Sequence, residues 1–176
     1  MIERLGGDFS VVLLVLGLPV LLGGLAACWQ PRRSWPIVAF SMVPLLALAW
    51  LSHLVLSQGG QTWLIELGSL TLQWRANGLT LLLLLLTQVI TLSCAAYAPG
   101  YLLEEIGDEG KQVWLWPLQG VLAASLSLIW LADDLLTLYI GLELMGLAAV
   151  GLMLLPGRVD ALAAGMRYLL LALVGS

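Results

Sequence analysis

The sequence predicts an all-α integral membrane protein with six transmembrane helices and a short β-hairpin between the second and third. Of its 176 residues, 61% are hydrophobic and only 10% are charged, and the mean hydropathy is +1.01. A soluble domain of this size needs a charged surface, and this chain has too few charged residues to make one. Six apolar runs have the length of a membrane span, and one segment between them alternates like a strand pair.

The six apolar runs contain about 18–22 residues each, which is the length needed to cross a hydrocarbon core ~30 Å thick. They cover residues 9–28, 35–57, 78–98, 113–132, 135–155 and 159–176. Little chain is left for a soluble domain, so we expect residues 1–176 to form a single transmembrane domain. Pro19, Pro44 and Pro117 lie inside these runs and predict kinked helices.

The segment 62–75 alternates between apolar and polar residues, and Gly68 and Ser69 divide it in half. A two-residue turn at that point pairs the two halves as antiparallel strands. Because side chains alternate along a strand, three apolar pairs would share one face. These pairs are Leu67–Leu70, Ile65–Leu72 and Trp63–Trp74. We expect a hairpin lying against the outer ends of the helices; an irregular amphipathic loop is the alternative.

The loop charges predict a topology. Loops that hold more Lys and Arg face the cytoplasm. The loops after the first, third and fifth runs contain Arg32, Arg33, Lys111 and Arg158, whereas the N-terminal segment and the hairpin contain Arg4 and Arg75. We therefore predict a multi-pass protein of the cell (inner) membrane, with both termini, the hairpin and the acidic pair Asp133 and Asp134 on the outer side.

Several classes of function find no support in the sequence. The net charge is −4 and there is no basic stripe, so nucleic acid is not an expected partner. Cys28 and Cys94 are far apart, without the spacing of a metal or redox motif, and fit small buried thiols. We predict no cofactor, no metal and no catalytic chemistry within this chain. His53 is alone near the end of an apolar run, where a packing or interfacial role is expected.

Glu143 and Arg167 are charged residues in the interior of the last two apolar runs. A charge at that depth costs at least a few kcal/mol, so such residues usually face protein or water and belong to an ion path. Each lies about 13 Å along a helix from the nearest loop charge, at roughly 1.5 Å per residue, which places both near the midplane. The short loop between the two runs makes the helices antiparallel neighbours. We therefore predict that Glu143 and Arg167 pair; a pair that only fixes helix packing is the alternative.

Further side chains complete the predicted site. Tyr139 lies one turn before Glu143 on the same helix face and could hydrogen-bond to it. Asp133, Asp134 and His53 lie near the ends of their runs. These last three are the candidates for a point where ions enter or where another subunit makes contact; for His53 this is the alternative to a packing or interfacial role.

Three stretches carry a resemblance to a known family. The run 135–155 resembles the fifth transmembrane helix of the antiporter-like subunits of respiratory complex I, membrane-bound hydrogenases and multi-subunit sodium/proton antiporters, with Glu143 at the position of the family's Glu. The stretch 161–176 looks like the following helix, where Arg167 and Tyr168 match a basic residue followed by an aromatic one. The stretch 77–80 looks like the Asp-Gly-Leu-Ser at the start of the third helix, with Asn77 in place of Asp.

The resemblance implies the front, six-helix portion of such a subunit, because these subunits have more helices than the six predicted here. It implies a membrane subunit that contributes to proton or sodium translocation in a larger, redox-linked complex, with Glu143 in the ion path and Arg167 as its electrostatic partner. The implied partners are other membrane subunits, including a chain with the missing later helices, and the lipid bilayer. The alternative is a structural or assembly subunit without an ion path of its own.

Overall fold

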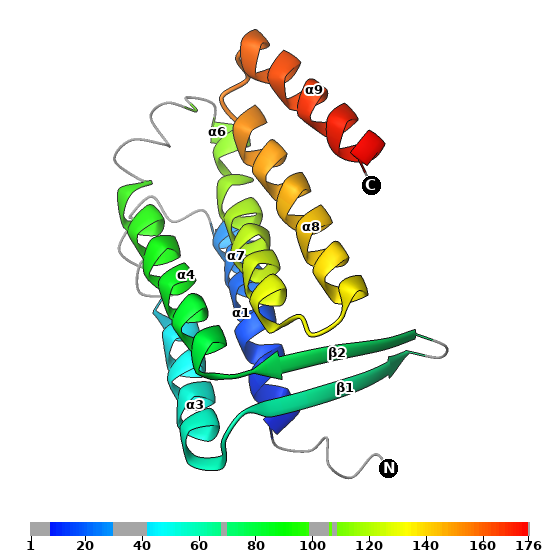
Figure 1. The fold of residues 1–176 in the computed structure, drawn as a ribbon. Coiled ribbons are helices and arrows are strands. Elements are labelled where there is room, and N and C mark those ends of the chain that lie inside the picture. Colours follow the sequence, from blue (N-terminus) through cyan, green and yellow to red (C-terminus); the bar gives the residue numbers. More distant parts are fainter. Residues whose placement is uncertain (1–7, 30–41, 68–69, 99–105, 107–108, 176) are drawn as a thin grey trace.

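The chain folds into a bundle of helices with a β-hairpin across one end (Figure 1). The computed structural model describes residues 8–29, 42–67, 70–98, 106 and 109–175. The elements, in chain order, are α1 (Asp8–Trp29), α3 (Val43–Gln58), β1 (Gln61–Leu67), β2 (Leu70–Ala76), α4 (Gly78–Tyr97), α6 (Glu109–Gln112), α7 (Leu115–Leu131), α8 (Leu135–Leu154) and α9 (Val159–Gly175).

Helix α7 is the centre of the bundle and packs against α1, α4 and α8. Its crossing with α1 is close because each helix has a glycine at the contact. A Cβ atom at Gly23 would lie 2.5 Å from the carbonyl oxygen of Trp116, and one at Gly120 would collide with the carbonyl oxygen of Pro19. Small residues that let two backbones approach in this way are typical of helix packing in membranes.

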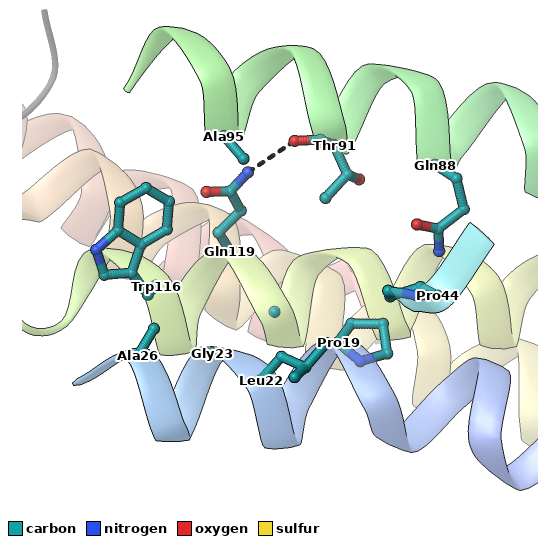
Figure 2. A pocket seen from close by; sticks show the side chains of 11 residues that line it. Pro19, Leu22, Gly23, Ala26, Pro44, Gln88, Thr91, Ala95, Trp116 and Gln119 are labelled. Carbon is teal, nitrogen blue, oxygen red and sulfur yellow. Dashed lines mark hydrogen bonds between the residues drawn. The ribbon is translucent and has the colours of Figure 1, made fainter. Parts of the chain in front are cut away.

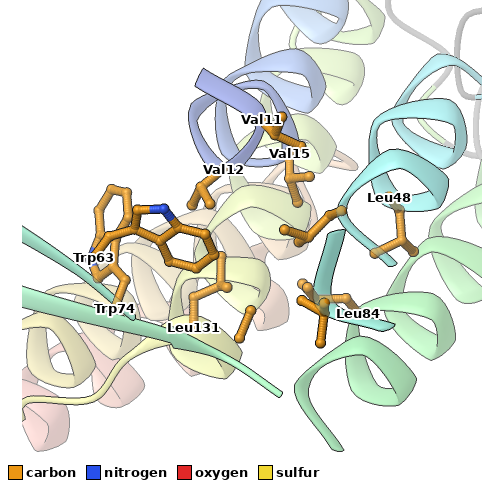
Figure 3. Packing of buried hydrophobic residues seen from close by; sticks show 11 residues of the cluster. Val11, Val12, Val15, Leu48, Trp63, Trp74, Leu84 and Leu131 are labelled. Carbon is orange, nitrogen blue, oxygen red and sulfur yellow. The ribbon is translucent and has the colours of Figure 1, made fainter. Parts of the chain in front are cut away.

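Two apolar clusters lie at the two ends of the bundle. The cluster at the hairpin end joins α1, α3, the hairpin, α4 and α7 (Figure 3). Its buried residues are Val11, Val12, Val15, Leu48, Leu51, Val55, Trp63, Trp74, Ala76, Leu84 and Leu131. The cluster at the other end consists of Ala26, Ala95, Ala98, Ile106, Leu115, Trp116 and Leu155. Uncharged polar side chains of α4 and α7 lie between the two clusters.

The predicted hairpin is confirmed in its register. Antiparallel β1 and β2 pair Leu67 with Leu70, Ile65 with Leu72 and Trp63 with Trp74. Both tryptophans are 7% exposed and face the bundle. The opposite face of β2 presents Thr71, Gln73 and Arg75 to the outside. Residues 68 and 69, where the turn is predicted, lie outside the described residues.

The predicted spans are matched in part. Within the described residues, three helices are long and apolar enough to cross a membrane: residues Ser10–Ala27 of α1, the whole of α4 and the whole of α8. Helices α3 and α7 are apolar but shorter. The first part of the predicted span 35–57 lies outside the described residues. Six membrane-crossing helices therefore stay a prediction.

Two of the three prolines lie at helix starts rather than in helix interiors. Pro44 is in the first turn of α3, and Pro117 is the third residue of α7. In a first turn the missing N–H has no helical partner to lose, so these prolines begin helices instead of kinking them. Only Pro19 among the three lies well inside its helix, α1.

Candidate functional site

Glu143 lies on α8, on a side of that helix which does not face α7. The side that faces α7 is set by Gly141, where a Cβ atom would lie 2.7 Å from Cγ1 of Ile129. Since a helix turns through about 100° per residue, Glu143 lies roughly 200° around the helix from Gly141. Its side chain is half-buried, and within the described residues its carboxylate has no salt bridge or hydrogen bond.

Helix α9 packs against the same side of α8. A Cβ atom at Gly165 would lie 3.2 Å from Leu154 and 3.4 Å from Val150, and one at Gly146 would lie 3.7 Å from the hydroxyl oxygen of Tyr168. Val150 is about two helical turns beyond Glu143, which places both on one face of α8. Glu143 is therefore on the α9 side of the bundle.

Arg167 does not meet Glu143, contrary to the predicted pairing. Gly165 and Tyr168 occupy the side of α9 that touches α8, and Arg167 lies roughly 200° around the helix from Gly165. Its side chain is exposed. In the described part of the chain a salt bridge joins Arg75 to Asp133, and none joins Glu143 to Arg167. Counting along the helices predicts depth, but it gives no means to judge rotation about the helix axis.

Tyr139 lies one turn before Glu143 on α8 and is 47% exposed. Across the described residues no hydrogen bond links its hydroxyl to Glu143. His53 is exposed on α3, and among the described residues it has no ion pair or hydrogen bond to Asp133 or Asp134. The roles proposed for these side chains in ion translocation stay predictions.

Asp134 joins the hairpin to the helix bundle. It is the N-cap of α8: one carboxylate oxygen accepts the backbone N–H of Thr137 at 2.7 Å, and the other accepts the Thr137 hydroxyl at 2.6 Å. The second oxygen also accepts the backbone N–H of Gln73 on β2 at 2.7 Å. One carboxylate thus satisfies donors from a helix start and from a strand edge.

Asp133 strengthens the same junction. Its backbone N–H donates to the carbonyl of Gln73 at 2.9 Å, and its carboxylate lies 3.0 Å from the guanidinium of Arg75. A bridge between Trp74 and Ala132 continues the strand pairing into the end of α7. The two acids predicted to admit ions or contact a subunit are thus seen here holding the hairpin against the bundle.

The hydrogen bonds at this junction change the acidity of Asp134. Partial burial by itself raises the pKa of a carboxyl group, because it disfavours the charged form. Hydrogen bonds from the Thr137 hydroxyl and from the backbone N–H groups of Gln73, Thr137 and Leu136 outweigh that effect, so the pKa of Asp134 is lowered from 3.8. Asp134 is therefore a carboxylate at neutral pH.

A seam of uncharged polar side chains between α4 and α7 was missed in the sequence. Gln119 Nε2 donates to the carbonyl of Thr91 at 3.1 Å, and Trp130 Nε1 donates to the hydroxyl of Thr87 at 3.0 Å. Gln88 follows Thr87 on α4 and lies beside the same seam (Figure 2). The sequence signal was a set of polar residues in an apolar run: Thr87 and Thr91 are one helical turn apart, and Gln88 follows Thr87.

In the described part of the chain, no group of three or more His, Cys, Asp and Glu side chains comes together, so these residues offer no candidate metal site.

Fold and site together define a class: a helical bundle with a hairpin at one end, in which three described helices are long and apolar enough to cross a membrane and one of them carries an acidic residue in its interior. No protein-family model and no curated protein matches this chain. Among solved structures, its fold is similar to that of a chain in the structure of the membrane-bound sulfane sulfur reductase (MBS), an archaeal respiratory membrane complex. The two chains are 21% identical, and the TM-score is 0.61. The similarity covers 82% of this chain and 22% of the other, so this chain spans about a fifth of the length of that neighbour.

Proposed function

We propose that this chain is a membrane subunit that contributes to proton or sodium translocation in a larger, redox-linked complex, as the front portion of an antiporter-like subunit. Glu143 would be the acidic group of the ion path. Arg167 would act as a positive charge on the neighbouring helix rather than as a contact partner. Any electron transfer would take place in other subunits.

The observation that most supports this proposal is the environment of the Glu143 side chain. It is half-buried, near the middle of one of the helices that are long and apolar enough to cross a membrane, and it makes no ion pair in the described part of the chain. A carboxylate in such a place is costly unless water or another polar group reaches it. In general, a carboxyl group in apolar surroundings takes up or releases a proton when its hydration or the nearby charge changes.

The structural neighbour supports a place in a larger assembly. The sulfane sulfur reductase is a respiratory membrane complex, and the chain that shares this fold is much longer than the present one. Helix α9 leaves Arg167, Met166 and Leu170 exposed, which is a surface suited to further helices. A partner carrying those helices would shield Arg167 from lipid.

The test is the pair of substitutions Glu143→Gln and Glu143→Asp in the assembled complex. Gln keeps the shape and hydrogen-bonding capacity of Glu but cannot ionise, so we expect normal assembly and loss of most ion translocation. Asp keeps the titrating group with a shorter reach and should retain part of the activity. Ion movement is measured in sealed vesicles, with and without sodium, and is normalised to the amount of intact complex.

Asp160→Asn is the matched control, because Asp160 is an exposed carboxylate in the first turn of α9, away from the apolar middle of the bundle. It should leave translocation unchanged. If Glu143→Gln assembles and still translocates ions at the full rate, Glu143 is not in the path. The chain would then be the structural or assembly subunit that is the alternative to this proposal.

A further inference from the structure

Gln88 is a buried polar side chain with an unused hydrogen-bond donor. It is 3% exposed, and its amide nitrogen has no hydrogen-bond partner within the part of the chain that the structure describes. Leaving such a donor unpaired in the interior costs about 1–3 kcal/mol. A native fold keeps a group of this kind when something in the surroundings satisfies it.

The side chain of Gln88 points into a partly open cavity lined by α1, α3, α4 and α7 (Figure 2). Its volume is about 50 Å³, and since one water molecule needs roughly 10–15 Å³ of such space, it has room for about three to five. Pro19 and Pro44 line it from α1 and α3, and Thr91 and Gln119 line it from α4 and α7. The apolar cluster at the hairpin end lies to one side of it along the bundle, and Ala26, Ala95 and Trp116 of the other cluster form part of its wall.

The polar groups on the walls suit water. The Thr91 hydroxyl donates to the carbonyl of Thr87 at 2.8 Å and keeps its capacity to accept. Gln119 uses one amide hydrogen on the carbonyl of Thr91 and retains a second hydrogen and its oxygen. Bound water typically makes two to four hydrogen bonds, and this set can supply them.

Water is also the ligand class that fits Gln88 best. A water molecule accepts from an amide nitrogen and donates to an amide oxygen, so it satisfies Gln88 whichever way the amide is turned. A cation would be attracted to the oxygen alone, and the described wall residues include no carboxylate to neutralise it. An acyl chain would leave the amide unpaired.

We propose that this cavity is a hydration site, in which a small cluster of water molecules is held by Gln88, Thr91 and Gln119 at mid-depth of the bundle. The inference goes beyond the proposed function and does not depend on Glu143. It places water in the interior of the bundle at a depth similar to that of Glu143, on the other side of α7.

Hydroxyl-radical footprinting of the assembled complex tests the proposal, because radicals formed from bound water oxidise the side chains next to that water. Both Trp116 and Trp63 belong to apolar clusters, but Trp116 also lines the cavity, whereas Trp63 does not. Their exposed fractions are nearly equal, 8% and 7%, so their oxidation rates compare a residue beside the cavity with one away from it at matched burial. We expect Trp116 to be oxidised several-fold faster than Trp63. Equal rates would overturn the proposal.

The substitution Gln88→Leu removes the polar anchor at nearly constant volume. It should lower the oxidation rate of Trp116 to that of Trp63, whereas Gln73→Leu, at an exposed position on β2, should leave both rates unchanged. A rate at Trp116 that does not respond to Gln88→Leu would show that Gln88 does not hold the water. If the Leu variant fails to assemble, the comparison of the two tryptophans in the unmodified complex still decides whether the cavity is wet.

Discussion

Asp134 shows how one side chain can decide the position of a whole substructure. It caps α8 through Thr137 and holds the strand edge through the N–H of Gln73. Hydrogen bonds to a carboxylate are stronger than those to a neutral acceptor. Because the folded protein favours the ionised form, the pKa of Asp134 is lowered from 3.8. The ionised carboxylate therefore stabilises the folded state at pH values above 3.8.

A pH dependence follows from the direction of this shift. The contribution of Asp134 should be complete at neutral pH, should begin to weaken below about pH 3.8, and should be lost as the pH falls through the lower pKa of the folded state. Asp134→Asn keeps a capping oxygen but not the charge. We expect it to lower the unfolding free energy at pH 7 by on the order of 1 kcal/mol, and the difference from the unmodified protein to vanish at strongly acidic pH.

Thermal unfolding of the protein in detergent, followed from pH 7 down to strongly acidic pH, measures that difference. Asp133→Asn is a suitable control, because its bridge to Arg75 is partly solvent-exposed and such pairs typically contribute little. If Asp134→Asn has an effect of the same size at every pH, the loss comes from geometry and not from charge.

The separation of Glu143 and Arg167 gives a second prediction at this scale. Since the two side chains make no ion pair, the effects of Glu143→Gln and Arg167→Gln on the stability of the complex should couple by less than about 0.5 kcal/mol, the lower end of what residues in contact show. The measurement is a double-substitution cycle on thermal unfolding of the assembled complex. A clearly larger coupling energy would mean that assembly turns α9 and brings the two charges together.

Among the elements, the crossing of α1 and α7 is a contact that glycine makes possible. Two neighbouring glycines of α1 differ sharply there: a Cβ atom at Gly23 would meet the backbone of Trp116 and Pro117, whereas one at Gly24 would meet nothing within 4 Å. The backbone of α7 cannot yield as a flexible side chain could. The helices would have to move apart to admit a methyl group at Gly23.

We therefore expect Gly23→Ala to destabilise the bundle by roughly 1–3 kcal/mol, as overpacking commonly does. Gly24→Ala should be neutral or slightly stabilising, because alanine favours helix. The thermal midpoints of the two variants in the same detergent give the comparison. Equal midpoints would mean that α1 can shift along α7 without loss.

At the scale of the whole molecule, different elements mark the two ends of the bundle. The hairpin lies at the end where α4 and α8 begin, and α6 lies at the opposite end (Figure 1). If the bundle spans a membrane, residues of the hairpin and of α6 face opposite compartments. The loop charges predict that the hairpin side is the outer one.

Cysteine labelling tests this orientation. Thr71 and Lys111 are exposed, one on β2 and the other in α6. In a background without Cys28 and Cys94, a membrane-impermeant thiol reagent applied to intact cells should label Thr71→Cys but not Lys111→Cys. Permeabilised cells, in which both should react, supply the control. The reverse pattern would invert the topology, and labelling of both sites in intact cells would rule out a spanning bundle.

The sequence alone determined the features that depend on order along the chain. The alternation of apolar and polar residues on both sides of Gly68 and Ser69 predicted the strand register, because successive side chains in a strand point to opposite faces. The apolar runs located the helices to within a few residues, apart from the part of the second run outside the described residues. The depth of Glu143 in α8 followed from counting along the helix.

The tertiary structure alone decided how each helix is turned about its axis. Most of these helices are apolar on nearly every side, so, apart from the polar residues of α4, no polar face indicates which residues point inward. Gln88 proved to face a cavity and Arg167 to face away from α8, although both lie in runs of apolar residues. Gly23 and Gly24 are neighbouring residues of the same type, and only the position of α7 leaves no room for a Cβ atom at one of them. Rotation depends on contacts between segments far apart in the chain, and no local pattern encodes it.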